Sequence, residues 1–263
     1  MAESARRDWL YYRIYLTDLK DAEGVLERTV RPEISASRSQ FPQLRWFYLR
    51  FVDATGPQLR LRLNLPLSEL ESLERHWDAR LAAPGVQRFV KSLYAPEIAK
   101  FGTNSAMRFA EELFQRGSEL ALECLGPRLR TMRTAYGAAV ATLLLAGLPA
   151  WQRIAFLHQY GWYWSGGPNT RRGGWPADIG PKARRFRTHV DHVLADPGTC
   201  ALLTAYQRDF WDALRSPARR DVPRSDYFLL FHHLHLTNNR LGVYPAAEAG
   251  LARLLWASEL AMA

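Results

Sequence analysis

The chain has 263 residues, of which 48% are hydrophobic and 12% aromatic, and this composition excludes a disordered or low-complexity protein. No apolar run reaches the roughly eighteen residues of a membrane span, because the best candidate, residues 137–151, is interrupted by Pro149. The first ten residues lack the apolar stretch of a secretory signal. Cys124 and Cys200 are the only cysteines, so we expect a protein of the reducing cytoplasm with no membrane association.

The charge of the chain predicts an acidic partner. The formal net charge is +9, and all but four of the 35 basic residues are arginine. Arginine favours bidentate capture of carboxylates or phosphates; the alternative explanation is a coding bias towards arginine. The arginines are scattered and form no nucleic-acid-binding signature, so we expect no nucleic-acid partner.

The first hundred residues predict the element order β-α-β-β-α-β. The first helix opens at Thr17 or Asp18 and should stop at Pro32, and the second has Ser68 as a candidate N-cap. This order is the split arrangement of a ferredoxin-like sandwich, in which both helices cover one face of the sheet. The expected strands span residues 11–16, 45–53, 58–64 and 86–94, and the expected helices 17–31 and 66–81.

Alternation along "GPQLRLRLN" (residues 56–64) predicts two different faces for one strand. Leucines occupy every second position, so they should pack under the helices, while the side chains between them point to the other face. Two guanidiniums then stand about 7 Å apart on the open face. We expect aromatic and basic side chains of the preceding strand beside them there. The residues of the predicted open face are Trp46, Tyr48, Arg50, Gln58, Arg60 and Arg62.

From about residue 102 onward the pattern predicts helices alone. The predicted fold class is therefore α+β: a ferredoxin-like portion at residues 1–101 and a helical portion at 102–263 packed over the open face of its sheet, as one compact unit with a cleft between them. The expected helices span residues 103–124, 128–148, 150–160, 181–195, 197–215, 225–240 and 245–261.

A glycine-rich segment interrupts the helical portion. Residues 164–180 hold five glycines and two prolines, and a loop of this length is usually functional or mobile. It lacks the features of a phosphate-binding loop. A substrate-gripping or lid role and an inert surface loop are both open.

Two polar stretches are candidates for proton transfer. On a helix, His232, His235 and Asn239 fall on one face, and Gly242 would close the helix in the left-handed conformation. A general acid or base and a structural histidine are both open, whereas a zinc site lacks a third ligand. Glu97 follows the last strand, where it could act as a base, hold the arginines or form a surface salt bridge. We expect neither a metal nor a cofactor.

Several blocks of the sequence occur in an order that resembles a known family. They are WLYYRIY at 9–15, WFYLRFVD at 46–53 with LRLRL at 59–63, YAPE at 94–97 with FG at 101–102, AEELF at 110–114, and HLTNNRLG at 235–242. Together they resemble the thiopeptide-type bacteriocin biosynthesis family, which comprises the small domain of lantibiotic dehydratases and its stand-alone relatives. The resemblance covers residues 9–250.

The resemblance implies an enzyme that modifies leader-bearing peptides. In one branch a glutamylated Ser or Thr loses glutamate. There Arg60 and Arg62 would grip the glutamyl group, Glu97 and Lys100 would assist, and His235 would move protons. The other branch, the pyridine synthases, joins two dehydroalanines in a formal [4+2] cycloaddition and expels water and the leader peptide. The catalytic set is then Arg60, Arg62, Glu97, His232 and His235, and the substrate-binding set is Trp46, Tyr48, Arg50, Gln58, Tyr94, Lys100, Asn239 and Arg240.

Departures from the elimination pattern favour the pyridine synthase branch. Elimination members have histidine where this chain has Gln58 and arginine where it has Lys100, and Thr103 and Gly117-Ser118 also differ from their blocks. The expected partner is a precursor peptide with an acidic leader and a dehydrated, azole-containing core, with other thiopeptide enzymes as further partners. Glutamate elimination and a non-catalytic leader-binding subunit remain the alternatives.

Overall fold

The computed structural model describes residues 6–166 and 179–261, and the chain clusters into two units. The first unit runs to Leu122 and includes Asp221–Pro223; the second holds Glu123–Arg220 and Arg224 onward. Each unit has a core of its own, the first around a sheet and the second among helices. This is the predicted α+β class: an antiparallel N-terminal sheet with interspersed helices, followed by a mostly helical region.

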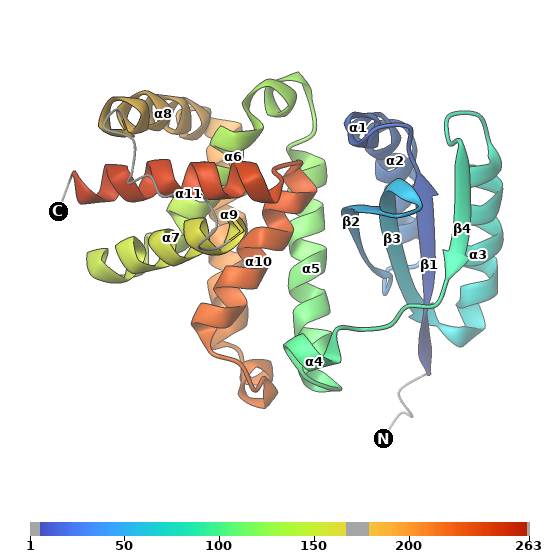
Figure 1. Ribbon diagram of the computed structural model, residues 1–263. Helices are drawn as coiled ribbons and strands as arrows, with labels where there is room; N and C mark the ends of the chain where they lie inside the picture. Colours follow the sequence, from blue (N-terminus) through green and yellow to red (C-terminus); the bar gives the residue numbers. More distant parts are fainter. Residues whose placement is uncertain (1–5, 167–178, 262–263) are drawn as a thin grey trace. The chain divides into compact units, whose positions relative to one another are not determined.

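The sheet of the first unit has four antiparallel strands in the order β2-β3-β1-β4 (Figure 1). All four predicted strands and both predicted helical regions are present, and β2 has the predicted bounds. Among the described residues the elements of this unit are β1 (Arg7–Tyr15), η1 (Leu19–Asp21), α1 (Ala22–Val25), η2 (Leu26–Val30), α2 (Arg31–Gln40), β2 (Arg45–Asp53), β3 (Gly56–Pro66), α3 (Leu67–Ala82), β4 (Arg88–Ser92), α4 (Ile98–Phe101) and α5 (Ser105–Glu123).

The first helical region continues through Pro32, so the predicted stop there is wrong. The segment η2 is a π-helical turn immediately before α2, and Pro32 occupies the first turn of α2. Proline removes one helical hydrogen bond, which here would go to the carbonyl of Arg28 four residues earlier. Arg80 on α3 donates to that carbonyl at 3.0 Å instead. Ser68 is likewise not a cap, because α3 begins one residue before it, after Pro66.

The predicted faces are right for β3 and wrong for β2. Leu59, Leu61 and Leu63 are fully buried on the helix-covered face, as predicted. Their direct partners across the hairpin, however, are Arg50, Tyr48 and Trp46, and directly paired residues share a face. These three side chains therefore lie in the core instead of on the open face, and none is more than 1% exposed. The open face of β2 carries the alternate side chains Phe47, Leu49 and Phe51.

A buried ion pair accompanies this reversal. Nη2 of Arg50 lies 3.5 Å from Oε1 of Glu23 on α1, and both side chains are almost fully buried. The aromatic rings of Trp46 and Tyr48 stack on each other beneath the same helices. These residues consequently hold the core of the first unit together.

Helix α5 covers the free edge of β2. The backbone N–H of Trp46 donates to Oε1 of Gln115, and that of Tyr48 donates to Oγ of Ser118. Phe114 adds an edge-to-face contact with Phe47. Because these side chains take the place of a further strand, the β2 edge is closed by α5, which belongs to the same unit as the sheet.

The second unit consists of helices. All six predicted helices after residue 124 are present, with ends within a few residues of those predicted. No described helix is both long enough and apolar enough to cross a bilayer. The predicted packing of the helical portion over the open face of the sheet stays a prediction. The helices are α6 (Pro127–Leu145), α7 (Ala150–Trp164), α8 (Ile179–Leu194), α9 (Pro197–Arg215), α10 (Asp226–Leu241) and α11 (Pro245–Leu260), with a short turn η4 (Pro217–Asp221) between α9 and α10.

Candidate functional site

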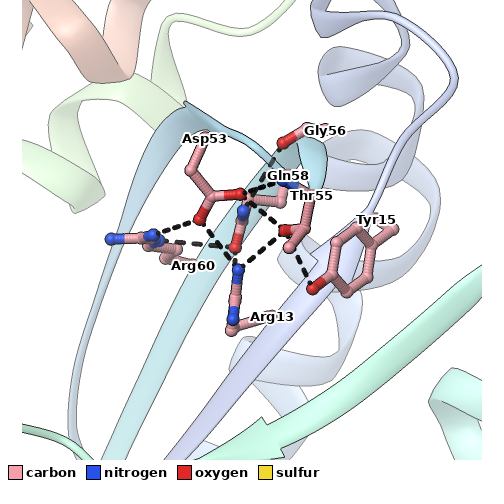
Figure 2. A network of polar contacts seen from close by, with 7 residues as sticks. All are labelled: Arg13, Tyr15, Asp53, Thr55, Gly56, Gln58 and Arg60. Atoms are coloured by element: carbon pink, nitrogen blue, oxygen red, sulfur yellow. Dashed lines mark hydrogen bonds and ion pairs between the residues drawn. The ribbon is translucent and has the colours of Figure 1, made fainter.

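A polar network occupies the open face of the sheet beside the β2–β3 turn (Figure 2). Oδ2 of Asp53 accepts hydrogen bonds from Nη2 of Arg13 at 2.8 Å and Nη2 of Arg60 at 2.9 Å. The hydroxyl and the backbone N–H of Thr55 both donate to the other carboxylate oxygen. These donors hold the pKa of Asp53 down, at about 2, with the Thr55 contacts as the largest cause. One carboxylate thus pairs with two arginines that stand directly opposite each other on β1 and β3.

Gln58 holds the guanidiniums of Arg13 and Arg60 in this network. It is fully buried, and its Oε1 accepts from Nε of Arg13 at 2.7 Å and more weakly from Nε of Arg60 at 3.4 Å. The Arg60 guanidinium also stacks on Phe51, 3.4 Å from the ring centroid. The predicted site residues Gln58 and Arg60 are therefore brought together, and Asp53, which the sequence does not single out, lies between Arg60 and Arg13.

Arg62 has different surroundings although it is only two residues away. Its guanidinium lies over the rings of Tyr11, Phe47 and Tyr94, at 4.5, 5.1 and 5.3 Å from their centroids. Burial lowers its pKa. Its Nε has no hydrogen-bond partner, and within the described ranges no carboxylate lies within ion-pair distance of it. A buried cation enclosed by aromatic rings and lacking a carboxylate is suited to an electron-rich or anionic group of a substrate.

A buried carboxyl group that the sequence patterns did not reveal lies beside these rings. Together with Arg62, Tyr11, Phe47 and Tyr94 it forms what we call the first cluster. Glu111 on α5 is only 8% exposed, and its Oε1 accepts a hydrogen bond of 3.0 Å from the hydroxyl of Tyr94. Burial raises the pKa of Glu111 to about 7, against the opposing effects of Tyr94, Arg45 and Arg62. A carboxyl group with such a pKa can both accept and donate a proton near neutrality. Its position in the AEELF block was the available signal.

Glu97 and Lys100 lie at the edge of the first cluster. Lys100 Nζ is 3.4 Å from Oε2 of Glu97, so the two form an ion pair one helical turn apart, and Glu97 is half exposed. This is the surface salt bridge that the sequence left open. Glu97 still acts electrostatically on Arg62 and Tyr94.

The histidines of α10 belong to a second cluster, which lies in the helical unit. Nδ1 of His235 is 2.9 Å from Oε1 of Glu248 on α11, and the hydroxyl of Tyr160 on α7 donates to the other oxygen of the same carboxylate. Glu248 and Tyr160 are fully buried. Because a carboxylate only accepts, Nδ1 carries the hydrogen of this contact. The ring of Trp164 stacks on His235 at 3.8 Å between centroids.

His235 is consequently oriented as a base. Its side chain is 18% exposed, and its Nε2 has no hydrogen-bond partner among the described residues. The contact with the buried carboxylate holds Nδ1 towards Glu248 and turns Nε2 away from it. Asn238 adds a long hydrogen bond of 3.4 Å to the Tyr160 hydroxyl.

The other predicted residues of α10 have different environments. Gly242 ends the helix in the left-handed conformation, with φ 81°, as predicted. His232 packs against the ring of Phe228 at 4.3 Å. Arg240 is 1% exposed, so it belongs to the core of the unit, and Asn239 is partly exposed. The substrate-binding roles of Asn239 and Arg240 stay predictions.

The described residues contain no group of three or more His, Cys, Asp or Glu side chains placed to hold a metal ion. Most of the glycine-rich segment, residues 167–178, lies outside the described residues, so the choice between a substrate-gripping or lid role and an inert surface loop is not tested.

Comparisons with known proteins place the chain in a family. Residues 9–259 match the model of the lantibiotic biosynthesis dehydratase C-terminal region. No curated protein matches. The crystal structure of the tRNA-dependent lantibiotic dehydratase MibB from Microbispora sp. 107891 is similar with a TM-score of 0.65 and 21% identity, over 100% of this chain and 29% of MibB.

A second solved structure, that of TsrL, is similar with a TM-score of 0.62 and 16% identity, over 98% of this chain and 95% of TsrL. This chain thus spans less than a third of the length of MibB and nearly the whole of TsrL. At these identities the two structures support the fold alone, whereas the family match extends over almost all of the sequence. The chain belongs to the family of lantibiotic biosynthesis dehydratase C-terminal domains.

Proposed function

We propose that the chain is a pyridine synthase of thiopeptide maturation. The reaction joins two dehydroalanines of a leader-bearing precursor by forming two carbon–carbon bonds, after one intervening amide has taken its iminol form. The iminol oxygen then leaves as water, and the bond from the ring to the leader's amide nitrogen breaks, releasing the leader as a carboxamide. The two eliminations produce the aromatic ring without an oxidant.

The observation that carries this proposal is the pairing of Arg60 with Asp53 at 2.9 Å. Glutamate elimination, as the family resemblance describes it, uses two arginines to grip the glutamyl carboxylate. Here the carboxylate of Asp53 already pairs with the Arg60 guanidinium, and Gln58 holds that guanidinium in place. Lys100, which stands where elimination members have arginine, is paired with Glu97. This arrangement supports a retained fold with a changed chemistry.

The residues of the two clusters can serve such a reaction by positioning and proton transfer. Arg62 would stabilise negative charge that develops on the amide oxygen, since buried donors act strongly at low dielectric. Glu111, with a pKa of about 7, and His235, with Nε2 oriented by Glu248, are the proposed proton-transfer groups. The proposed partner is the predicted cytoplasmic precursor, with an acidic leader and a dehydrated, azole-containing core.

Glutamate elimination is the second candidate. The family match itself favours it, because the matched region belongs to lantibiotic dehydratases. Arg60, Arg62, Glu97 and His235 stand at the positions that the resemblance assigns to that reaction, so their presence alone does not separate the two chemistries.

Mass spectrometry separates the candidates. The purified chain is incubated with a fully dehydrated, azole-containing precursor in the absence of glutamyl-tRNA. Release of an intact leader fragment together with a macrocycle that has lost water supports the pyridine synthase. Loss of glutamic acid, seen only with a glutamylated peptide, would show that the chain catalyses glutamate elimination instead. Leader binding without turnover on either substrate would leave the non-catalytic subunit.

A further inference from the structure

The two edges of the sheet are treated differently by the fold. The β2 edge is closed by Gln115 and Ser118 of α5. The β4 edge, at the opposite side of the sheet (Figure 1), pairs only inward with β1. Within the described part of the chain, no backbone hydrogen bond from a segment other than β1 reaches Arg88–Ser92. An unpaired edge strand is a template for a further strand.

The side chains of β4 leave this edge accessible. A lysine at an exposed edge often prevents pairing with a further strand, and Lys91 is the candidate for that role here. Its ammonium instead lies 2.7 and 2.8 Å from the carboxylates of Glu74 and Asp78 on α3, over the helix-covered face. Val90 is 40% exposed, and Leu93, directly after the strand, is 96% exposed. A docked strand would find apolar side chains at this edge.

A cationic hollow adjoins the beginning of β4. It has a volume of about 330 Å³, and its lining includes Gln87, the residue before the strand, together with Gly85. Lys20 and Arg28 supply its positive charge. No described carboxylate lies within ion-pair distance of either. Asp21 also lines the hollow, but its carboxylate accepts the backbone N–H of Asp18.

The walls of the hollow are held by local contacts. Gln87 donates from Nε2 to Oγ1 of Thr17, which ties the start of β4 to the segment after β1. The Arg28 guanidinium lies against Gly24, where a Cβ atom would come within 2.8 Å of Nη2. A glycine at this position therefore lets the charged head rest on the helix backbone at the side of the hollow.

We propose that the β4 edge docks an extended, acidic peptide segment, which adds a fifth strand to the sheet and places a carboxylate between Lys20 and Arg28. Charge decides the choice of occupant. Arg88, exposed and stacked on Tyr15 at 3.8 Å, adds a third cation with no described carboxylate partner along the same edge. A second copy of this chain would bring a like-charged strand to this edge, whereas an acidic strand complements it.

The inference rests on the proposed function for one point, that the docked segment is the leader of the peptide substrate. A peptide substrate with an acidic leader would be held by its leader at β4. The docking chemistry itself requires only a strand that carries carboxylates.

The test uses a fluorescein-labelled twelve-residue peptide of alternating valine and glutamate, with no dehydrated core. Fluorescence anisotropy measures its affinity for the wild type and for Lys20→Glu/Arg28→Glu. The matched control is Arg75→Glu/Arg208→Glu, which changes the net charge equally at side chains that are 72% and 68% exposed. We expect about a tenfold loss of affinity in the first variant only, because the two substitutions reverse both charges that would contact the bound carboxylate.

Hydrogen–deuterium exchange locates the bound strand. The peptide should slow exchange of the amides of Arg88–Leu93 and leave those of Arg45–Asp53 unchanged. Equal affinity of the two variants, or protection away from β4, would overturn the proposal. Protection that grows with protein concentration without peptide, together with a dimer in light scattering, would assign the edge to a second copy instead.

The outcomes separate this inference from the proposed function. Peptide binding and amide protection without any cyclisation of the dehydrated precursor would support the docking edge and overturn the proposed pyridine synthase activity. Unchanged cyclisation kinetics and KM in Lys20→Glu/Arg28→Glu would keep the enzyme and overturn the assignment of the docked segment as the leader.

Discussion

Tyr94 donates its hydroxyl hydrogen to Oε1 of Glu111 at 3.0 Å, and the carboxyl group that receives it has a pKa of about 7. Burial is the main cause of this raised pKa. In the unfolded chain the same carboxyl has its ordinary pKa of about 4.5. The folded state therefore holds the proton more tightly, and the resulting stability is full below pH 4.5 and is lost as the pH rises through 7.

Glu111→Gln should remove this pH dependence. Relative to the variant, the wild type should lose about 3 kcal/mol of unfolding free energy between pH 4 and pH 8, because one pKa unit corresponds to about 1.4 kcal/mol. Urea unfolding at a series of pH values measures the difference. The control is Glu112→Gln on the same helix, whose side chain is half exposed and which should follow the wild type. Parallel curves for wild type and Glu111→Gln would show that the carboxyl titrates normally.

Asp53→Asn should turn the Arg13–Arg60 pair into an anion site. The substitution keeps the shape of the side chain and removes the negative charge that pairs with both guanidiniums. We expect glutamate or a glutamylated peptide to bind about tenfold more tightly to the variant, as charged hydrogen bonds contribute about 1.5–3 kcal/mol. Titration calorimetry measures the affinity.

The control for this prediction is Asp8→Asn. Asp8 lies on β1, is exposed, and its carboxylate accepts only the N–H of Trp9 among the described residues. The net charge changes equally, so an equal gain in affinity in both variants would contradict a specific role for Asp53.

Strand and helix positions were predictable from the sequence, but the pairing of faces was not. The sequence predicts the strand at 45–53 and the leucine face of the next strand, since both follow from local alternation. Which residues of the two strands share a face depends on the turn. Asp53 pairs with Gly56, so only two residues lie between the strands. A three-residue connection would have placed Trp46 on the open face, and this difference of one residue reverses every side chain.

The candidate site was predictable only where its residues lie in recognisable blocks. Arg62 and His235 are in such blocks, and both lie at chemically distinctive places. Asp53 and Glu111 were missed because their roles come from partners 40 and 17 residues away, Arg13 and Tyr94. Local sequence patterns do not encode such contacts. A carboxylate acquires its pKa from burial and neighbours that only the folded chain brings together.

The corrected faces of β2 can be tested by stability. Trp46→Ala removes a ring that is 1% exposed, whereas Phe51→Ala removes one that is 39% exposed. Core aromatic truncations cost about 3–5 kcal/mol, so Trp46→Ala should lower the unfolding free energy by that amount and Phe51→Ala by about 1 kcal/mol or less. Chemical denaturation measures both. The reverse order of the two losses would restore the open-face position of Trp46.

Glu248→Gln should disturb the histidine of the second cluster without unfolding the helical unit. The neutral amide has only one oxygen to accept hydrogen bonds, so it cannot accept from both Tyr160 and Nδ1 of His235 as the carboxylate does. The hydrogen on Nδ1 is then no longer favoured over one on Nε2. Nitrogen NMR of the imidazole should show a single Nδ1–H tautomer in the wild type and a mixture in the variant. Turnover of a peptide substrate should fall about a hundredfold if His235 is a general base, and the pH dependence of the rate should shift with it.

Two further variants separate orientation from stability. Glu259→Gln removes a carboxylate from the same helix, where it pairs with Arg153, and should leave the His235 tautomer unchanged. The double variant His235→Ala/Glu248→Gln should be no slower than His235→Ala alone, because Glu248 acts through the histidine. Independent losses in the double variant would mean that Glu248 supports the reaction by another route, such as the packing of Tyr160 against α11.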